Sequence, residues 1–141
     1  MADQLIQGWI QGCVVDKIVC RDDLVLNLDH DSELVISAPL RLTLPETDTY
    51  PAEVVAVDAT SIPADLRPLL DIAGATCTHA GWNGDGDLHL EFSGGHQIDV
   101  STSADTTAWE LYGKHHGYVA CLPRGDVRIV RHDLPQGVNT R

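Results

Sequence analysis

The chain is dominated by short segments in which apolar and polar residues alternate. In segment 23–28, Leu24, Leu26 and Leu28 fall on one face of an extended strand. An acidic turn follows, and segment 33–37 then alternates in the same way, so the two segments predict a hairpin. The other strands predicted by alternation and β-branched residues are 13–19, 40–44, 53–57, 87–92, 97–101, 106–113, 118–122 and 126–131. The pattern therefore predicts a mainly β, antiparallel chain.

One segment, near 63–73, departs from this alternation and predicts a short helix. Pro63 suits the first position of a helix, and Gly74 suits the left-handed residue that closes one. Pro68 lacks an N–H donor, so we expect a single turn followed by a short helix over 68–73. The residues expected to face the core are Leu66, Leu69, Leu70 and Ala73.

The two central hairpins have nearly the same pattern. Shifting 23–37 by 64 residues places it on 87–101 without a gap, and Cys13 then falls on Cys77. We interpret segments 12–37 and 76–101 as an internal pseudo-repeat of a three-stranded unit. The alternative is that any two alternating hairpins align in this way. The aligned pairs include Leu24 with Leu88, Leu26 with Leu90, Leu28 with Phe92, Leu34 with Ile98, and Ile36 with Val100.

The length of 141 residues suits a single domain that spans 1–141. We predict an antiparallel sandwich or a half-open barrel, built from the two related three-stranded units, with the one short helix between them. Segment 118–131 is predicted to form a C-terminal hairpin, and 132–141 a frayed tail. The residues expected in the core or an interface because of their size are Trp9, Trp82 and Trp109.

The charge of the chain is strongly negative and unevenly distributed. The net charge is −12, with −15 in residues 1–110 and +3 in residues 111–141. So negative a chain argues against nucleic-acid and anionic-membrane partners, which bind basic patches. We expect a cytoplasmic protein, because the chain starts without signal-peptide features and no apolar run approaches the roughly 18 residues of a membrane helix. The basic C-terminal part either packs on the acidic body or forms a surface for a partner.

The most site-like segment is the loop at 113–117. Glycines bound it on both sides, and it holds one lysine and two histidines, which titrate near neutral pH. Exposed aromatic and basic residues are typical anchors of protein interfaces. The alternative is a hairpin loop with incidental histidines. The candidate binding residues, for an interface or a ligand, are Trp109, Tyr112, Lys114, His115, His116, Tyr118 and Arg124.

A second group of candidates lies on the second hairpin. His89 and Glu91 share one face of a strand, and Cys77 and His79 approach them if segment 75–80 pairs with that strand. These residue types suit zinc, but their spacing matches no established zinc pattern, so we expect no bound metal or other cofactor. The four cysteines form no C-x-x-C motif, and we expect them to be reduced and buried.

Signals for catalysis are weak. The chain lacks the G-x-S-x-G motif of serine hydrolases and the Gly-rich phosphate loops of nucleotide-binding proteins. We therefore favour a non-enzymatic module that binds another protein or self-associates as a homodimer. The alternative is a metal-dependent or small-ligand-binding protein, or an enzyme, that uses either the second hairpin or the loop with His115 and His116.

The C-terminal part also carries a resemblance. It contains Trp109-Glu110-Leu111 and, after the loop, Tyr118-Val119-Ala120-Cys121-Leu122-Pro123-Arg124-Gly125. Together with segment 12–15 and the hairpin after it, this pattern resembles a small family of β-rich, uncharacterised actinobacterial proteins. The resemblance implies a small β fold and an actinobacterial source, and it implies no activity and no site residue.

Overall fold

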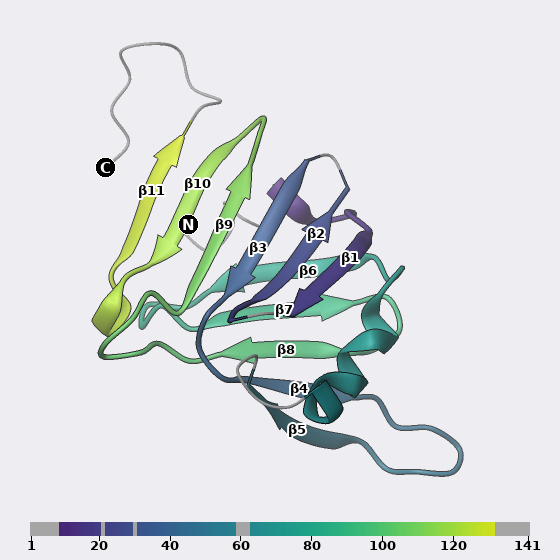
Figure 1. The fold of residues 1–141 in the computed structure, drawn as a ribbon. Helices are drawn as coiled ribbons and strands as arrows, with labels where there is room; N and C mark the ends of the chain where they lie inside the picture. The colour runs from purple at the N-terminus through teal and green to yellow at the C-terminus, as the bar shows by residue number, and fades with distance from the viewer. Residues whose placement is uncertain (1–8, 21, 30, 59–62, 132–141) are drawn as a thin grey trace.

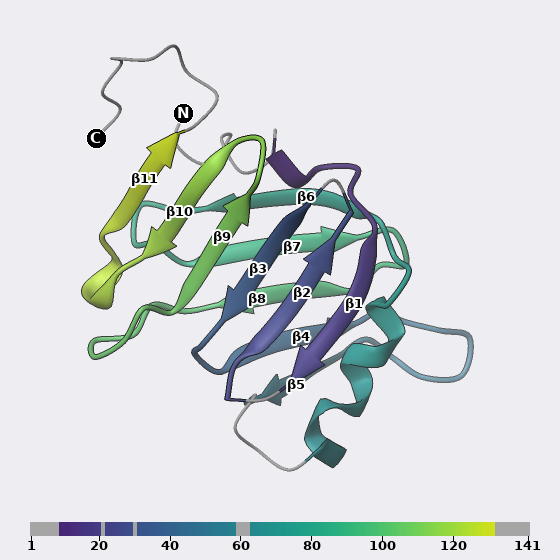
Figure 2. The same ribbon diagram turned by 45° about the horizontal axis from the view of Figure 1, so that its top comes forward.

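The structure is a computed structural model that describes residues 9–20, 22–29, 31–58 and 63–131, except for the side chains of residues 63–67. The chain forms two antiparallel sheets that pack face to face, with their strands crossing steeply (Figures 1 and 2). The sheets are not closed into a barrel. The predicted mainly β, single-domain fold is confirmed, and of the two predicted architectures the structure has the sandwich. The predicted C-terminal tail lies outside the described residues.

The six-stranded sheet has the strand order β1-β2-β3-β9-β10-β11. Its strands are β1 (Val15–Cys20), β2 (Leu24–Leu28), β3 (Ser32–Ile36), β9 (Trp109–Gly113), β10 (Gly117–Cys121) and β11 (Val127–Arg131). The five-stranded sheet has the order β5-β4-β8-β7-β6. Its strands are β4 (Leu40–Leu44), β5 (Glu53–Val57), β6 (Cys77–Trp82), β7 (Leu88–Phe92) and β8 (Gln97–Val100). Every predicted strand is present, with its ends shifted by a few residues at most.

The chain exchanges strands between the two sheets. Strands β1 to β3 lie in one sheet, and β4 then crosses over to pair with β8; β6 to β8 lie in the other sheet, and β9 crosses back to pair with β3. The two hairpins have the same register, because Leu24 pairs with Ile36 and Leu88 pairs with Val100. The two three-stranded segments thus occupy corresponding places in opposite sheets. Their origin by duplication stays a prediction.

The helix expected near 63–73 is present as the 3-10 helix η1 (Pro63–Ile72). It continues through Pro68, where the sequence predicted a break between a turn and a short helix. Gly74 follows it with a φ of +85°, which is the left-handed conformation expected of the closing residue. A second 3-10 helix, η2 (Pro123–Gly125), forms the turn between β10 and β11.

The face that η1 buries differs from the prediction. Leu69 and Ile72 are buried, whereas Leu70 is 63% exposed and Ala73 is exposed, and the side chain of Leu66 lies outside the description. A 3-10 helix has three residues per turn, so residues three apart share one face. The prediction for Leu70 and Ala73 was wrong because it assumed α-helical spacing. Among the described residues no helix is long and apolar enough to cross a membrane.

The core lies between the two sheets and is formed by alternate residues of nearly every strand. Trp82 and Trp109 pack against each other with ring centroids 5.8 Å apart, and Trp9 is buried as well. The indole N–H of Trp109 donates a hydrogen bond to the carbonyl oxygen of Gly86 at 2.9 Å. All three tryptophans therefore belong to the core.

The four cysteines are free thiols, but they do not share one environment. Cys13, Cys77 and Cys121 are buried, whereas Cys20 is exposed at the end of β1, contrary to the expectation that all four are buried. Cys20 is the last residue of β1, which is an edge strand of its sheet. Burial is the main cause that raises the pKa of Cys13 and of Cys77 to about 11, so both remain thiols at neutral pH.

Candidate functional site

Of the predicted binding residues, Tyr112 and Tyr118 lie on the outer face of the six-stranded sheet, which no strand or helix in the described part of the chain covers (Figures 1 and 2). Tyr112 on β9 and Tyr118 on β10 are cross-strand partners, and Tyr112 is 46% exposed. Trp109 on β9 points into the core and is fully buried. The structure therefore replaces the binding role predicted for Trp109 with a packing role, because strand alternation puts it on the face opposite Tyr112.

The loop between β9 and β10 contacts the protein's own body. The Nε2 atom of His115 lies 3.6 Å from Oδ2 of Asp31, and the backbone N–H of Lys114 donates to the Asp31 carbonyl oxygen at 3.1 Å. The His116 ring stacks on Trp9, with centroids 5.4 Å apart and planes 13° apart. At these residues the basic C-terminal part does pack on the acidic body.

Arg124 lies apart from the other predicted binding residues. It sits in the turn between β10 and β11, whereas the loop with Lys114 lies at the opposite end of β10. Its φ is +73°, an unusual conformation for a residue other than glycine. The structure therefore brings together Tyr112, Lys114 and Tyr118 but not Arg124.

A hollow of about 450 Å³ opens beside Tyr112, and we refer to it as the Tyr112 hollow. Its wall contains three carboxylates and one lysine. The lining residues are Asp16, Asn27, Leu28, Asp31, Ser32, Glu33, Tyr112 and Lys114. Sequence reasoning missed most of them, because Glu33 meets Tyr112 only through the pairing of β3 with β9, which lie far apart in the chain.

The outer face of the five-stranded sheet is polar. Strand pairing places Arg41 of β4, Asp99 of β8, His89 of β7 and Gly81 of β6 in one row across four strands. The neighbouring row consists of Thr43, Gln97, Glu91 and His79. The second hairpin therefore does gather its polar residues on one surface.

His89 lies between two carboxylates. Its Nδ1 is 2.6 Å from Oδ1 of Asp99, and its Nε2 is 2.9 Å from Oε2 of Glu91. Both ring nitrogens face acceptors, and only the protonated imidazolium can donate from both. Partial burial lowers the pKa of His89, but the hydrogen bonds to Asp99 and Glu91 and their negative charges outweigh it, so the pKa lies above its ordinary value.

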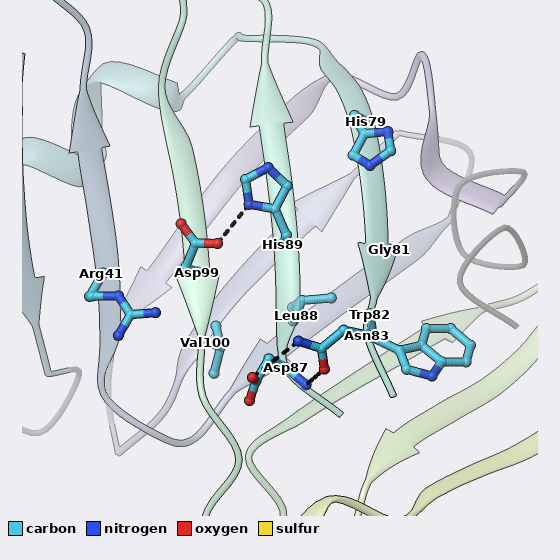
Figure 3. Close-up of a pocket in the computed structure, with 10 residues that line it drawn as sticks. All are labelled: Arg41, His79, Gly81, Trp82, Asn83, Asp87, Leu88, His89, Asp99 and Val100. Carbon is cyan, nitrogen blue, oxygen red and sulfur yellow. Dashed lines mark hydrogen bonds and ion pairs between the residues drawn. The ribbon is translucent and has the colours of Figure 1, made fainter. Parts of the chain in front are cut away.

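A second hollow, of about 310 Å³, lies beside this imidazole, and we refer to it as the His89 hollow. Figure 3 shows the residues that line it: Arg41, His79, Gly81, Trp82, Asn83, Asp87, Leu88, His89, Asp99 and Val100. At one side, Asn83 Nδ2 donates to Asp87 Oδ2 at 3.2 Å, and Asp87 Oδ1 accepts from the backbone N–H of Thr102 at 3.1 Å. The ring of His79 lies 6.0 Å from that of His89.

The four candidate metal ligands do not all lie on one face of the sheet. Cys77 is fully buried in the core, and its thiol donates to the carbonyl oxygen of His79 at 3.4 Å. His79, His89 and Glu91 lie on the outer face of the same sheet. A β-bulge between Cys77 and His79 puts an extra residue between them but leaves the thiol on the core side. Across the described residues, no group of three or more His, Cys, Asp or Glu side chains is arranged to hold a metal ion.

One family model matches residues 6–131, and its description is "Family of unknown function (DUF6188)". No curated protein and no solved structure matches the chain. The match covers most of the chain and agrees with the resemblance to an uncharacterised family, although it bears on neither the organism nor the C-terminal pattern.

Proposed function

Because this chain belongs to the DUF6188 family, whose function is unknown, we propose a function from its own surface: it is a protein-binding module that uses the outer face of the six-stranded sheet. The observation that carries the proposal is the exposed Tyr112 at the edge of the Tyr112 hollow. Tyrosine offers a partner a large amphipathic surface at a low cost in side-chain entropy, and it is enriched among the residues that dominate binding energy.

Apolar side chains extend the contact surface around Tyr112. Val19, Val25 and Val35 form a cross-strand row on β1, β2 and β3, and all three are partly exposed. Val130 of β11 pairs with Tyr118 and is 38% exposed. A face that combines apolar residues, an aromatic anchor and a polar rim has the composition of a protein interface.

The charge of the protein favours a basic partner over a second copy of this chain. Asp16, Asp31 and Glu33 surround the Tyr112 hollow, and residues 1–110 carry a net charge of −15. A basic surface is attracted to such a field, which speeds association and suppresses wrong partners. Two copies of a chain with a net charge of −12 repel each other instead.

The proposal is tested by capture of a partner from native lysate on the immobilised protein and on two pairs of variants. Tyr112→Ala is paired with Tyr50→Ala, because Tyr50 is also exposed, at 71%, but lies in the segment between β4 and β5. Glu33→Lys is paired with Glu53→Lys, which makes the same charge change on exposed β5. We expect Tyr112→Ala and Glu33→Lys to lose the captured protein and both control variants to keep it.

Two results would contradict the proposal. One is a wild-type chain that captures no protein and is monomeric in light scattering. The other is a protein captured equally by wild type, Tyr112→Ala and Glu33→Lys, because the binding surface would then lie elsewhere. If light scattering shows a dimer and Tyr112→Ala dissociates it, the binding surface is the proposed one. The partner is then a second copy of the chain and not a basic protein.

A further inference from the structure

The His89 hollow lies on the opposite sheet and is independent of the proposed protein-binding face. Four neighbouring strands contribute to it, and its volume of about 310 Å³ is at the lower end of the range for small-molecule sites. Its described lining includes no exposed Phe, Tyr or Trp that could stack on a base or a sugar, since Trp82 is buried. Its polar groups therefore decide what it binds.

Arg41 is the positively charged residue of this hollow that forms no ion pair with a carboxylate of the described residues. Pairing of β4 with β8 places Arg41 beside Asp99, yet within the described part of the chain no carboxylate oxygen lies within 4.0 Å of its guanidinium. The charge of Asp99 is engaged by His89, which lies 2.6 Å away on its other side. The imidazolium thus competes with Arg41 for Asp99 and leaves the guanidinium donors available.

The remaining groups of the hollow are held in place by contacts within the protein. Figure 3 shows the guanidinium of Arg41 extending along the sheet on the same side as Asp99 and Asp87. The Asp87 carboxylate accepts from Asn83 and from the backbone of Thr102, so its oxygens are already directed to donors. The amide of Asn83 has a second N–H, and His79 adds another donor beside His89.

We propose that the His89 hollow binds the oxyanion of a small molecule, a carboxylate or a phosphate group, and that Arg41 is its principal charge partner. The guanidinium forms paired hydrogen bonds with the oxygens of such a group, a geometry that lysine does not reproduce. In the same row, Asp99 and Glu91 engage both ring nitrogens of His89, so this imidazole does not compete with Arg41 for the ligand. A carboxylate and a phosphate group both present a pair of oxygens that share negative charge, and this pair is what Arg41 recognises.

The test is a titration of the ¹⁵N-labelled full-length chain with acetate and, separately, with inorganic phosphate, at constant ionic strength. We expect saturable chemical-shift changes at the amides of Gly81, His89 and Asp99. Arg41→Gln should weaken the binding at least about tenfold, because hydrogen bonds to a charged group typically contribute about that factor. Lys17→Gln removes the same charge from an exposed position on the other sheet and should leave the affinity unchanged.

The two probes distinguish the two sources of the oxyanion. Saturation by acetate alone assigns a carboxylate ligand, and saturation by phosphate alone assigns a phosphate ligand. The proposal is overturned if neither anion gives saturable shifts at the hollow, or if Arg41→Gln binds as tightly as the wild type. Arg41→Lys is expected to bind with intermediate affinity, since it keeps the charge but not the planar pair of donors.

Discussion

At the level of single residues, the surroundings of His89 show what strand alternation predicts and what it does not. Alternation places His89 and Glu91 on one face of β7, and this was predicted. Asp99 was not predicted, although a hairpin with its turn at residues 93–96 puts it opposite His89. Arg41 could not be predicted, because it reaches this surface only through the pairing of β4 with β8. Local pattern thus predicts which face a side chain occupies, and pairing decides its neighbours.

Protonation of His89 contributes to stability in a definite pH range. Since the pKa of His89 is raised in the folded protein, the folded state binds this proton more tightly than the unfolded chain does. The contribution is fully present below the ordinary histidine pKa of about 6.5 and is lost as the pH rises through the raised value. We predict that His89→Gln destabilises the protein more at low than at high pH, measured as urea unfolding midpoints at about pH 5.5 and pH 8.5.

The matched control is His115→Gln, whose imidazole is exposed and lies 3.6 Å from Asp31. The imidazolium assignment would be contradicted if His89→Gln lost the same stability at both pH values, or if it lost more stability at the higher pH.

The elements of the fold were predicted well, and their close contacts were not. The alternation predicts every strand except β6, because one face of each of these strands packs on the core. The helix was placed correctly, but Leu70 and Ala73 of its predicted core face are exposed because the local geometry is 3-10. Gly86, in the turn at 83–87, lies against Gly125, in the turn at 122–126. The glycines predict a turn at each place but do not predict this contact. That contact joins the ends of two sheets, and no local pattern encodes it.

The contact between these turns requires glycine at Gly125. Its φ is +92°, and a Cβ at this position would clash with the carbonyl oxygen of Asp85, which is backbone and cannot simply rotate away. We predict that Gly125→Ala lowers the free energy of unfolding by about 2 kcal/mol or more. Gly84→Ala is the control, since a Cβ there meets no atom within 4 Å. Equal stability of the two variants in urea unfolding would show that the turns can separate without loss.

The arrangement of the whole molecule depends on pairings that sequence reasoning did not find. The two hairpins were predicted, but β4 and β9 exchange between the sheets, and only this exchange brings Glu33 beside Tyr112 and Arg41 beside Asp99. Pairings between segments so distant in the chain leave no periodic signal in either one. The charge, in contrast, follows from the sequence directly, and it indicates what kind of partner the molecule attracts.

A net charge of −12 predicts a salt-dependent association with the proposed basic partner. The association rate constant should fall as salt is added, because steering by charge is screened, while the dissociation rate constant changes less. Stopped-flow mixing with the captured partner at low and at high salt measures both. Glu33→Lys should reduce the salt dependence. An association rate that salt does not change would indicate a partner without a basic surface.

The measurement that tests the protein-binding function most directly is the affinity of the purified, captured partner for Tyr112→Ala and for Tyr50→Ala, determined by calorimetry. Both variants remove an exposed tyrosine, so they differ only in the surface that is altered. We predict that Tyr112→Ala binds about 30-fold more weakly than the wild type, a loss of about 2 kcal/mol, and that Tyr50→Ala binds like the wild type. An unchanged affinity for Tyr112→Ala would contradict the assignment of this face as the binding surface.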